Sequence, residues 1–89
     1  MILEPIGDVD FHVADQLRIA GLAAIVAGAP EIAVDLSRVT FIDSSGLAAL
    51  ITINNELRPS DRKLVLLAPA RPVSRILEIT GLVPAFTVE

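Results

Sequence analysis

The alternation of short apolar segments with longer helix-like segments predicts an α/β fold, in which a mostly parallel sheet is joined by helical crossovers. Residues 31–36 and 63–67 have the length and apolar character of strands buried in such a sheet. Residues 11–27 follow a capping residue and precede stop signals, which is typical of a helix. A length of 89 residues corresponds to a single domain, 1–89.

The N-terminal half is predicted to contain two strands and one helix. Residues 1–6 form a short first strand. The first helix covers 11–27, with Asp10 as its N-cap and Gly28 as a stop signal. The apolar run 31–36 follows and is expected at the centre of the sheet.

The C-terminal third is predicted to contain two further strands and one helix. Residues 59–61 form a turn, and 63–67 form a buried strand. A helix opens at 69–72, buries Val73, Ile76 and Leu77, and ends before Gly81. Residues 86–88 form a last short strand.

The composition excludes several classes of site. The absence of cysteine excludes disulfides and Cys-based zinc sites, and a single histidine, His12, excludes a histidine-rich metal site. A net charge of −4 provides no basic surface for nucleic acid. The longest uncharged apolar stretch, 19–30, is too short to span a membrane, and no secretion signal opens the chain. We therefore expect a cytoplasmic domain without a metal or cofactor.

The most informative stretch is Val-Thr-Phe-Ile-Asp-Ser-Ser-Gly-Leu, residues 39–47. We expect it to be a loop that leads into a second helix, capped by Asp43 or Ser44. Ser44 and Ser45 then lie at a helix N-terminus, where backbone N–H groups point outward and the dipole favours negative charge. A serine in this place can cap the helix, and it can also accept a phosphate without unfolding the chain.

This stretch resembles the signature of STAS domains, most closely that of bacterial anti-sigma factor antagonists. Residues 7–10 are similar to the Gly-Glu-Leu-Asp turn of that family, 34–37 to its central strand, and 79–82 to the end of its last helix. The resemblance covers residues 5–88 and implies a sheet of four or five strands with at least three helices.

The resemblance also implies that the N-terminal strand of the family is missing here. The sheet edge that this strand covers would then be open, and an open edge invites pairing with another chain. A homodimer, a strand exchange or a misassigned start codon would each account for this difference.

Several functional residues follow from the same resemblance. The unphosphorylated protein would bind an anti-sigma factor that is a serine kinase, the kinase would phosphorylate Ser44 with its own ATP, and a serine phosphatase would reset the switch. Ser45 would hydrogen-bond the loop backbone, and Gly46 would let backbone or partner approach closely. The partner-binding residues implied in this way are Asp8, Asp10, Asp43, Ser44, Ser45, Gly46 and Leu47.

The first helix is unusually apolar on more than one side. Leu17, Ala20, Ala24 and Leu22 are the residues expected to pack on the sheet. That packing leaves a second set exposed, which is either a contact surface or simply the apolar side of a small-residue helix. The candidate interface residues are Ile19, Ala23 and Val26.

Two alternative functions compete with this interpretation, and the sequence disfavours the second of them. The domain can be a non-phosphorylated accessory subunit of a bacterial ABC lipid transporter or part of a stress-signalling scaffold, although such transporter subunits often replace the serine pair. An enzyme with Ser44 as nucleophile would need a base, and the only histidine is His12. The pattern Gly-x-Ser-x-Gly is absent, so we do not expect an enzyme.

Overall fold

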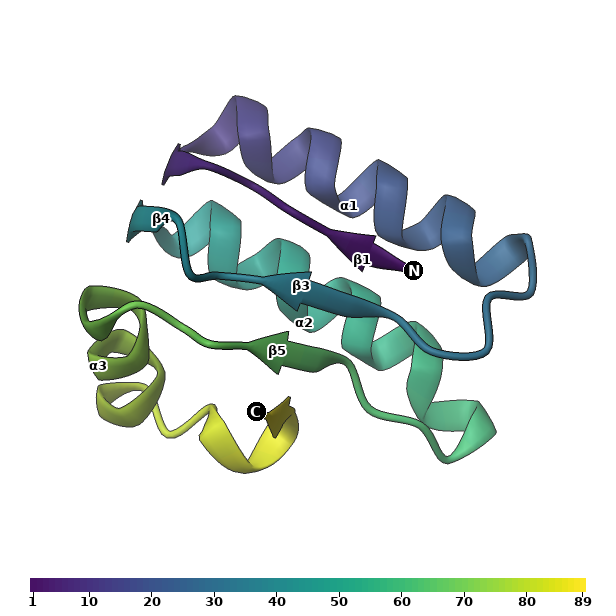
Figure 1. Ribbon diagram of the computed structural model, residues 1–89. Coiled ribbons are helices and arrows are strands. Elements are labelled where there is room, and N and C mark those ends of the chain that lie inside the picture. The colour runs from purple at the N-terminus through teal and green to yellow at the C-terminus, as the bar shows by residue number, and fades with distance from the viewer.

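A four-stranded parallel sheet in the order β1-β3-β5-β6 forms one layer of the structure, a computed structural model that describes residues 1–89 (Figure 1). Two further strands, β2 and β4, form a separate parallel pair. The strands are β1 Ile2–Leu3, β2 Gly7–Val9, β3 Ala33–Asp35, β4 Val39–Ile42, β5 Val65–Leu67 and β6 Thr87–Val88. The α-helices are α1 Phe11–Val26, α2 Ser44–Leu57 and α3 Arg71–Ile79. All strand pairings are parallel, so the predicted fold class is confirmed.

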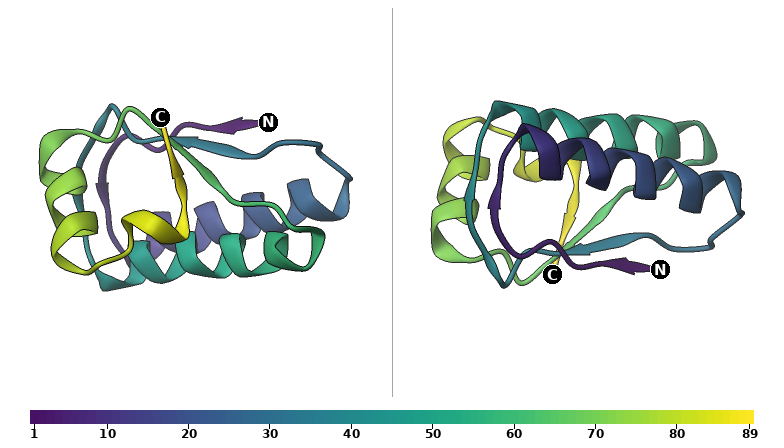
Figure 2. Two further views of the ribbon diagram at one scale, coloured as in Figure 1. Left: turned by 90° about the horizontal axis from the view of Figure 1, so that it is seen from below. Right: turned by 90° about the horizontal axis from the view of Figure 1, so that it is seen from above.

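The helices are distributed unevenly around the sheet. Helices α1 and α2 lie side by side on one face of it, and α3 lies at the end where it packs against β4 (Figure 2). Alternate strand residues point into the space between sheet and helices, as the two-residue period of a strand requires. Val34 on β3 and Leu66 on β5 are fully buried there, and they pack in one cluster with Leu50 and Ile53 of α2.

Strand β3 lies inside the sheet between β1 and β5, as expected for the apolar run 31–36. Strand β1 forms one edge of the sheet. The third helix and the final strand also form where they were predicted, and Gly81 adopts a φ of 71° just after α3, which only glycine tolerates easily.

Two strands were missed. The segment 39–42 was expected to be a loop and Gly7–Val9 a turn, but they form β4 and β2. Val39 and Ile42 are buried while the two residues between them are exposed, so β4 lacks the strict alternation by which a strand is recognised. Each strand is three or four residues long and becomes stable only through pairing with the other, which a local pattern cannot reveal.

Helix α1 begins as predicted, with the backbone N–H of Val13 donating to Asp10 Oδ1 at 3.0 Å. Its buried face differs from the expected one. Ala20 is exposed, and Gly21 takes its place beside Ala14, Leu17 and Ala24, because α1 packs against α2 as well as the strands. No helix in the structure combines the length and the apolar character that a membrane span requires.

Candidate functional site

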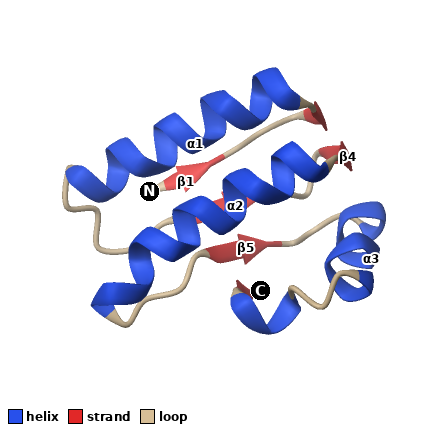
Figure 3. Ribbon diagram, turned by 180° about the vertical axis from the view of Figure 1, so that it is seen from behind, coloured by secondary structure: helices blue, strands red, loops and turns tan.

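The pairing of β2 with β4 brings the starts of α1 and α2 together. Val9 pairs with Ile42, and the next residues, Asp10 and Asp43, are the N-caps of the two helices. Because parallel strands run in the same direction, both helices start at the same end of the molecule, as Figure 3 shows. Two helix N-termini with aspartate caps therefore lie next to each other.

Asp43 organises the start of α2. Its Oδ1 accepts hydrogen bonds from the backbone N–H groups of Ser45, at 2.9 Å, and Gly46, at 3.1 Å, and from the Ser45 hydroxyl. The Ser45 hydroxyl, followed by the Gly46 N–H, holds the pKa of the Asp43 carboxyl below its ordinary value. The carboxylate is therefore ionised at neutral pH and locks the first turn of the helix.

Ser44 does not cap helix α2. It is the first residue of α2, its side chain is exposed, and its hydroxyl takes no part in the hydrogen bonds that cap the helix. Of the two caps considered from sequence, the structure uses Asp43. Ser44 is thus available to a partner without any loss of internal contacts.

Ser45 and Gly46 face inward from the same turn. The Ser45 hydroxyl donates to the Asp43 side chain, whereas the loop backbone was expected to be its partner. Gly46 is buried, and a Cβ on it would meet the side chains of Ile42 and Val9. The close approach that glycine permits is made inside the molecule, where α2 packs on β2 and β4.

The remaining predicted site residues lie around this turn. Asp8 is exposed on β2, and its Oδ1 accepts a hydrogen bond of 2.8 Å from the Thr40 hydroxyl of β4. Leu47 is half-buried and packs against the core. Asp43 directly precedes Ser44, and Asp10 caps the neighbouring helix, with Asp8 two residues before it on β2. These groups do not form a cluster that could hold a metal ion.

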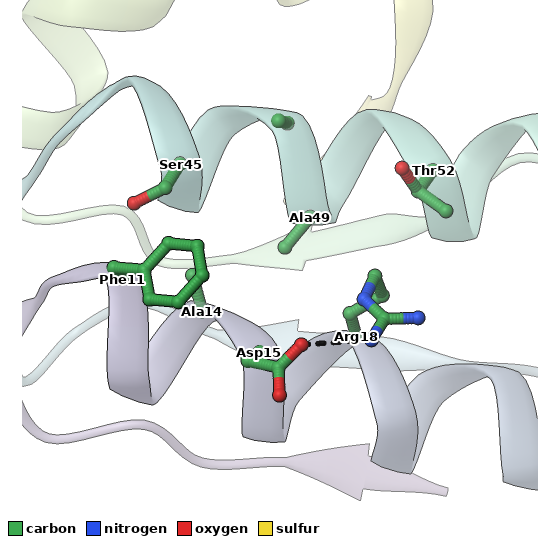
Figure 4. Close-up of a pocket in the computed structure, with 8 residues that line it drawn as sticks. Phe11, Ala14, Asp15, Arg18, Ser45, Ala49 and Thr52 are labelled. Atoms are coloured by element: carbon green, nitrogen blue, oxygen red, sulfur yellow. Dashed lines mark hydrogen bonds and ion pairs between the residues drawn. The ribbon is translucent and has the colours of Figure 1, made fainter.

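A groove between α1 and α2 adjoins residues 43–46, which we call the serine turn, and it was not predicted from the sequence. We call it the α1–α2 groove; its volume is about 190 Å³. Figure 4 shows Phe11 and Ser45 facing each other at one end and the Asp15–Arg18 ion pair, 2.7 Å long, at the other. The lining residues are Phe11, Ala14, Asp15, Arg18, Ser45, Ala48, Ala49 and Thr52. The available signal was Phe11, an aromatic residue directly after a helix cap.

Two further features were singled out from the sequence, His12 and an exposed set of residues on the first helix. His12 is exposed in the first turn of α1 and makes no hydrogen bond to Ser44, so a nucleophile–base pair is not formed. Ile19, Ala23 and Val26 are exposed, as expected. Val26 is 15 residues beyond Phe11 in the same helix, which places it about 22 Å from the serine end at 1.5 Å per residue.

Comparison with known proteins gives one family and several named relatives. The model of the STAS domain family matches residues 1–89. An anti-sigma-B factor antagonist of Staphylococcus aureus is 29% identical over 76 residues, which are 85% of this chain and 70% of that protein. The relatives therefore share most of their length with this chain.

Solved structures agree with this assignment. The anti-sigma factor antagonist SpoIIAA in its unphosphorylated form superposes with a TM-score of 0.84 at 28% identity, covering 99% of this chain and 77% of that one. The Bacillus cell fate determinant SpoIIAA in its phosphorylated form gives 0.76 at 27% identity, covering 99% and 80%. Both the family model and the fold lead to one conclusion: this chain belongs to the STAS domain family.

Proposed function

We propose that this protein is a cytoplasmic anti-sigma factor antagonist, a regulatory binding module and not an enzyme. Its unphosphorylated form binds an anti-sigma factor of the serine-kinase type and thereby frees a sigma factor. The kinase then phosphorylates Ser44 and releases the antagonist, and a serine phosphatase restores the binding form. Relatives named as anti-sigma factor antagonists support the general role.

The observation that carries the proposal is that different residues cap α2 and remain exposed at its start. Asp43 and Ser45 cap the helix, and Ser44 remains exposed with its hydroxyl free of internal hydrogen bonds. A kinase can therefore reach this oxygen, and a phosphate on it removes no contact that stabilises the fold. This arrangement suits a switch that changes binding but leaves the structure intact.

The mechanism of release is electrostatic. Phosphorylation adds about −1.5 to −2 charge at neutral pH. The N-terminus of α2 tolerates this charge, because its dipole and outward N–H groups favour anions. A partner that covers Ser44 would instead bury the phosphate beside the carboxylates of Asp10 and Asp43, at a large desolvation and repulsion cost. The fold should survive phosphorylation while the complex dissociates.

A second function has one observation in its favour. The exposed residues Ile19, Ala23 and Val26 lie far from Ser44 and form an apolar surface of the kind that permanent partners cover. A constitutive subunit of a lipid transporter or a signalling scaffold would use such a surface without phosphorylation.

Intact-mass spectrometry tests the proposal. The protein is incubated with ATP, magnesium and each serine-kinase-type anti-sigma factor from the same genome. We expect the addition of one phosphate, mapped to Ser44, that is abolished in Ser44→Ala and retained in the control Ser60→Ala, which changes an exposed serine beyond the end of α2. Transfer to another residue, or no transfer to folded protein by any of these kinases, would favour the constitutive subunit.

A further inference from the structure

We propose that the α1–α2 groove receives an aliphatic side chain from a basic segment of the anti-sigma kinase, with Phe11 as the main contact residue. This inference rests on the proposed function and identifies how the partner is recognised beside Ser44. It assigns a binding role to residues outside the serine turn, on a surface that the sequence did not indicate.

The first support is the position of Phe11. It is the first residue of α1, just as Ser44 is the first residue of α2, and both follow caps that succeed the paired residues Val9 and Ile42. Phe11 and Ser44 thus occupy equivalent places on neighbouring helices. Ser45 lines the groove opposite Phe11 (Figure 4). A kinase surface that covers Ser44 and extends across the neighbouring helix start would therefore also meet Phe11.

The second support is the chemistry of the groove. Its sides are largely methyl groups of Ala14, Ala48 and Ala49 together with the Phe11 ring, which is 76% exposed. Three of the four polar side chains that line the groove already have partners, because the Ser45 hydroxyl donates to Asp43 and Arg18 pairs with Asp15. Exposed aromatic residues next to such depressions often dominate binding energy, because they bury a large area at small entropic cost.

The third support is charge, which decides between a kinase and a second copy of this chain. The two charged residues that line the groove, Asp15 and Arg18, pair with each other. The exposed carboxylates without an ion pair next to it are Asp10, which precedes Phe11, and Asp8, two residues earlier on β2. A second copy would bring the same carboxylates into contact with them and be repelled. A segment with lysine or arginine beside its aliphatic side chain would complement them.

The test compares groove variants with matched controls on the same helices. Affinity for the ADP-loaded, magnesium-bound kinase is measured by calorimetry. Phe11→Ala removes the aromatic wall, and Ala48→Phe fills the groove; each should weaken binding by about tenfold or more, while Phe11→Leu should recover part of the loss. Gln16→Ala and Asn55→Ala change exposed residues of α1 and α2 outside the groove and should bind like wild type.

The outcomes separate this inference from the proposed function. In one outcome, the wild-type protein binds the kinase and is phosphorylated on Ser44 while Phe11→Ala and Ala48→Phe bind with undiminished affinity. That result would contradict the role of the groove and leave the switch intact. An equal loss of binding in Gln16→Ala or Asn55→Ala would show that the effect is not specific to the groove, which also overturns the inference. If no kinase of this type binds the wild-type protein, the proposed function fails and the inference fails with it.

Discussion

At the scale of single residues, one carboxylate oxygen controls the start of α2. Asp43 Oδ1 accepts three hydrogen bonds, and the Ser45 hydroxyl contributes most to the lowered pKa of this carboxyl. A depressed folded-state pKa means that the ionised group stabilises the native state above its unfolded pKa, and that this stabilisation is lost as the pH falls through the folded value. The hydrogen bonds by which the Asp43 carboxylate stabilises the serine turn are therefore weakened by acid, below about pH 4.

Ser45→Ala tests this hydrogen bond. We expect the pKa of Asp43 to rise toward its ordinary value, because the two backbone N–H groups remain but the hydroxyl donor is lost. The variant should also lose stability at pH 7 relative to wild type, and this difference should shrink as the pH falls through the lowered pKa of Asp43, below which the carboxyl is protonated in both proteins.

Carboxyl-detected NMR titration and denaturant unfolding at several pH values give these quantities. Ser44→Ala is the control, since its hydroxyl does not contact Asp43, and it should leave both the pKa of Asp43 and the stability within about 0.5 kcal/mol of wild type. An unchanged pKa of Asp43 in Ser45→Ala would show that the hydroxyl bond is absent in solution.

At the scale of secondary-structure elements, the contact between α1 and α2 depends on Gly21. A Cβ at this position would lie 2.5 Å from Ile53 Cδ1 and 2.7 Å from Ile53 Cγ1, and Ile53 is fully buried. Gly21→Ala should destabilise the fold by about 1–3 kcal/mol through overpacking, partly offset by about 1 kcal/mol of better helix propensity.

Urea unfolding of Gly21→Ala, Ile53→Val and the double variant measures this contact. Valine lacks the Cδ1 atom, so the double variant should be more stable than the sum of the single effects predicts, by about 0.5 kcal/mol or more. Strict additivity of the two substitutions would mean that the helices are farther apart than in this structure.

The C-terminal segments are held to α2 by a buried amide. Asn54 Nδ2 donates to the Ala85 carbonyl at 3.0 Å, and its Oδ1 accepts from the Leu64 N–H at 2.8 Å. Asn54→Ala leaves the Leu64 N–H buried without a partner and should cost about 1–3 kcal/mol.

Thermal or urea unfolding checks this prediction against Asn55→Ala, which changes the exposed neighbour on the same helix and should stay within about 0.5 kcal/mol of wild type. Equal stability of the two variants would contradict the role assigned to Asn54.

The sequence predicted some of these elements and could not predict others, for physical reasons. Asp10 and Gly81 act locally through caps and φ angles, so the helices that they bound were correctly predicted. The pairing of β2 with β4 joins residues about thirty positions apart, and no local pattern encodes it. The same pairing brings Phe11 beside the serine turn, which is why the α1–α2 groove was missed although Ser44 was found.

At the scale of the whole molecule, the structure separates two surfaces. The molecule measures 31 × 25 × 19 Å, and the serine turn lies at the start of α1 and α2 while the exposed residues Ile19 and Val26 lie toward the other end of α1. Val26 is 88% exposed. Changes at this second surface should therefore leave the serine switch unaffected.

Ile19→Glu and Val26→Glu test whether the second surface is an interface. Both residues are exposed, so the unfolding free energy should change by no more than about 0.5 kcal/mol. We expect weaker self-association in sedimentation velocity, because a charge in an apolar contact must be desolvated. If the two variants are unfolded and no folded variant with weaker self-association is found, these residues belong to the core instead.

The most direct test of the switch compares three forms of the protein in calorimetric titrations against the ADP-loaded kinase. Wild type and Ser44→Ala should bind equally, and Ser44→Asp should bind at least about tenfold more weakly while its NMR spectrum shows an intact fold. Equal affinity of all three forms would contradict the account, because a charge at Ser44 would then have no influence on the partner.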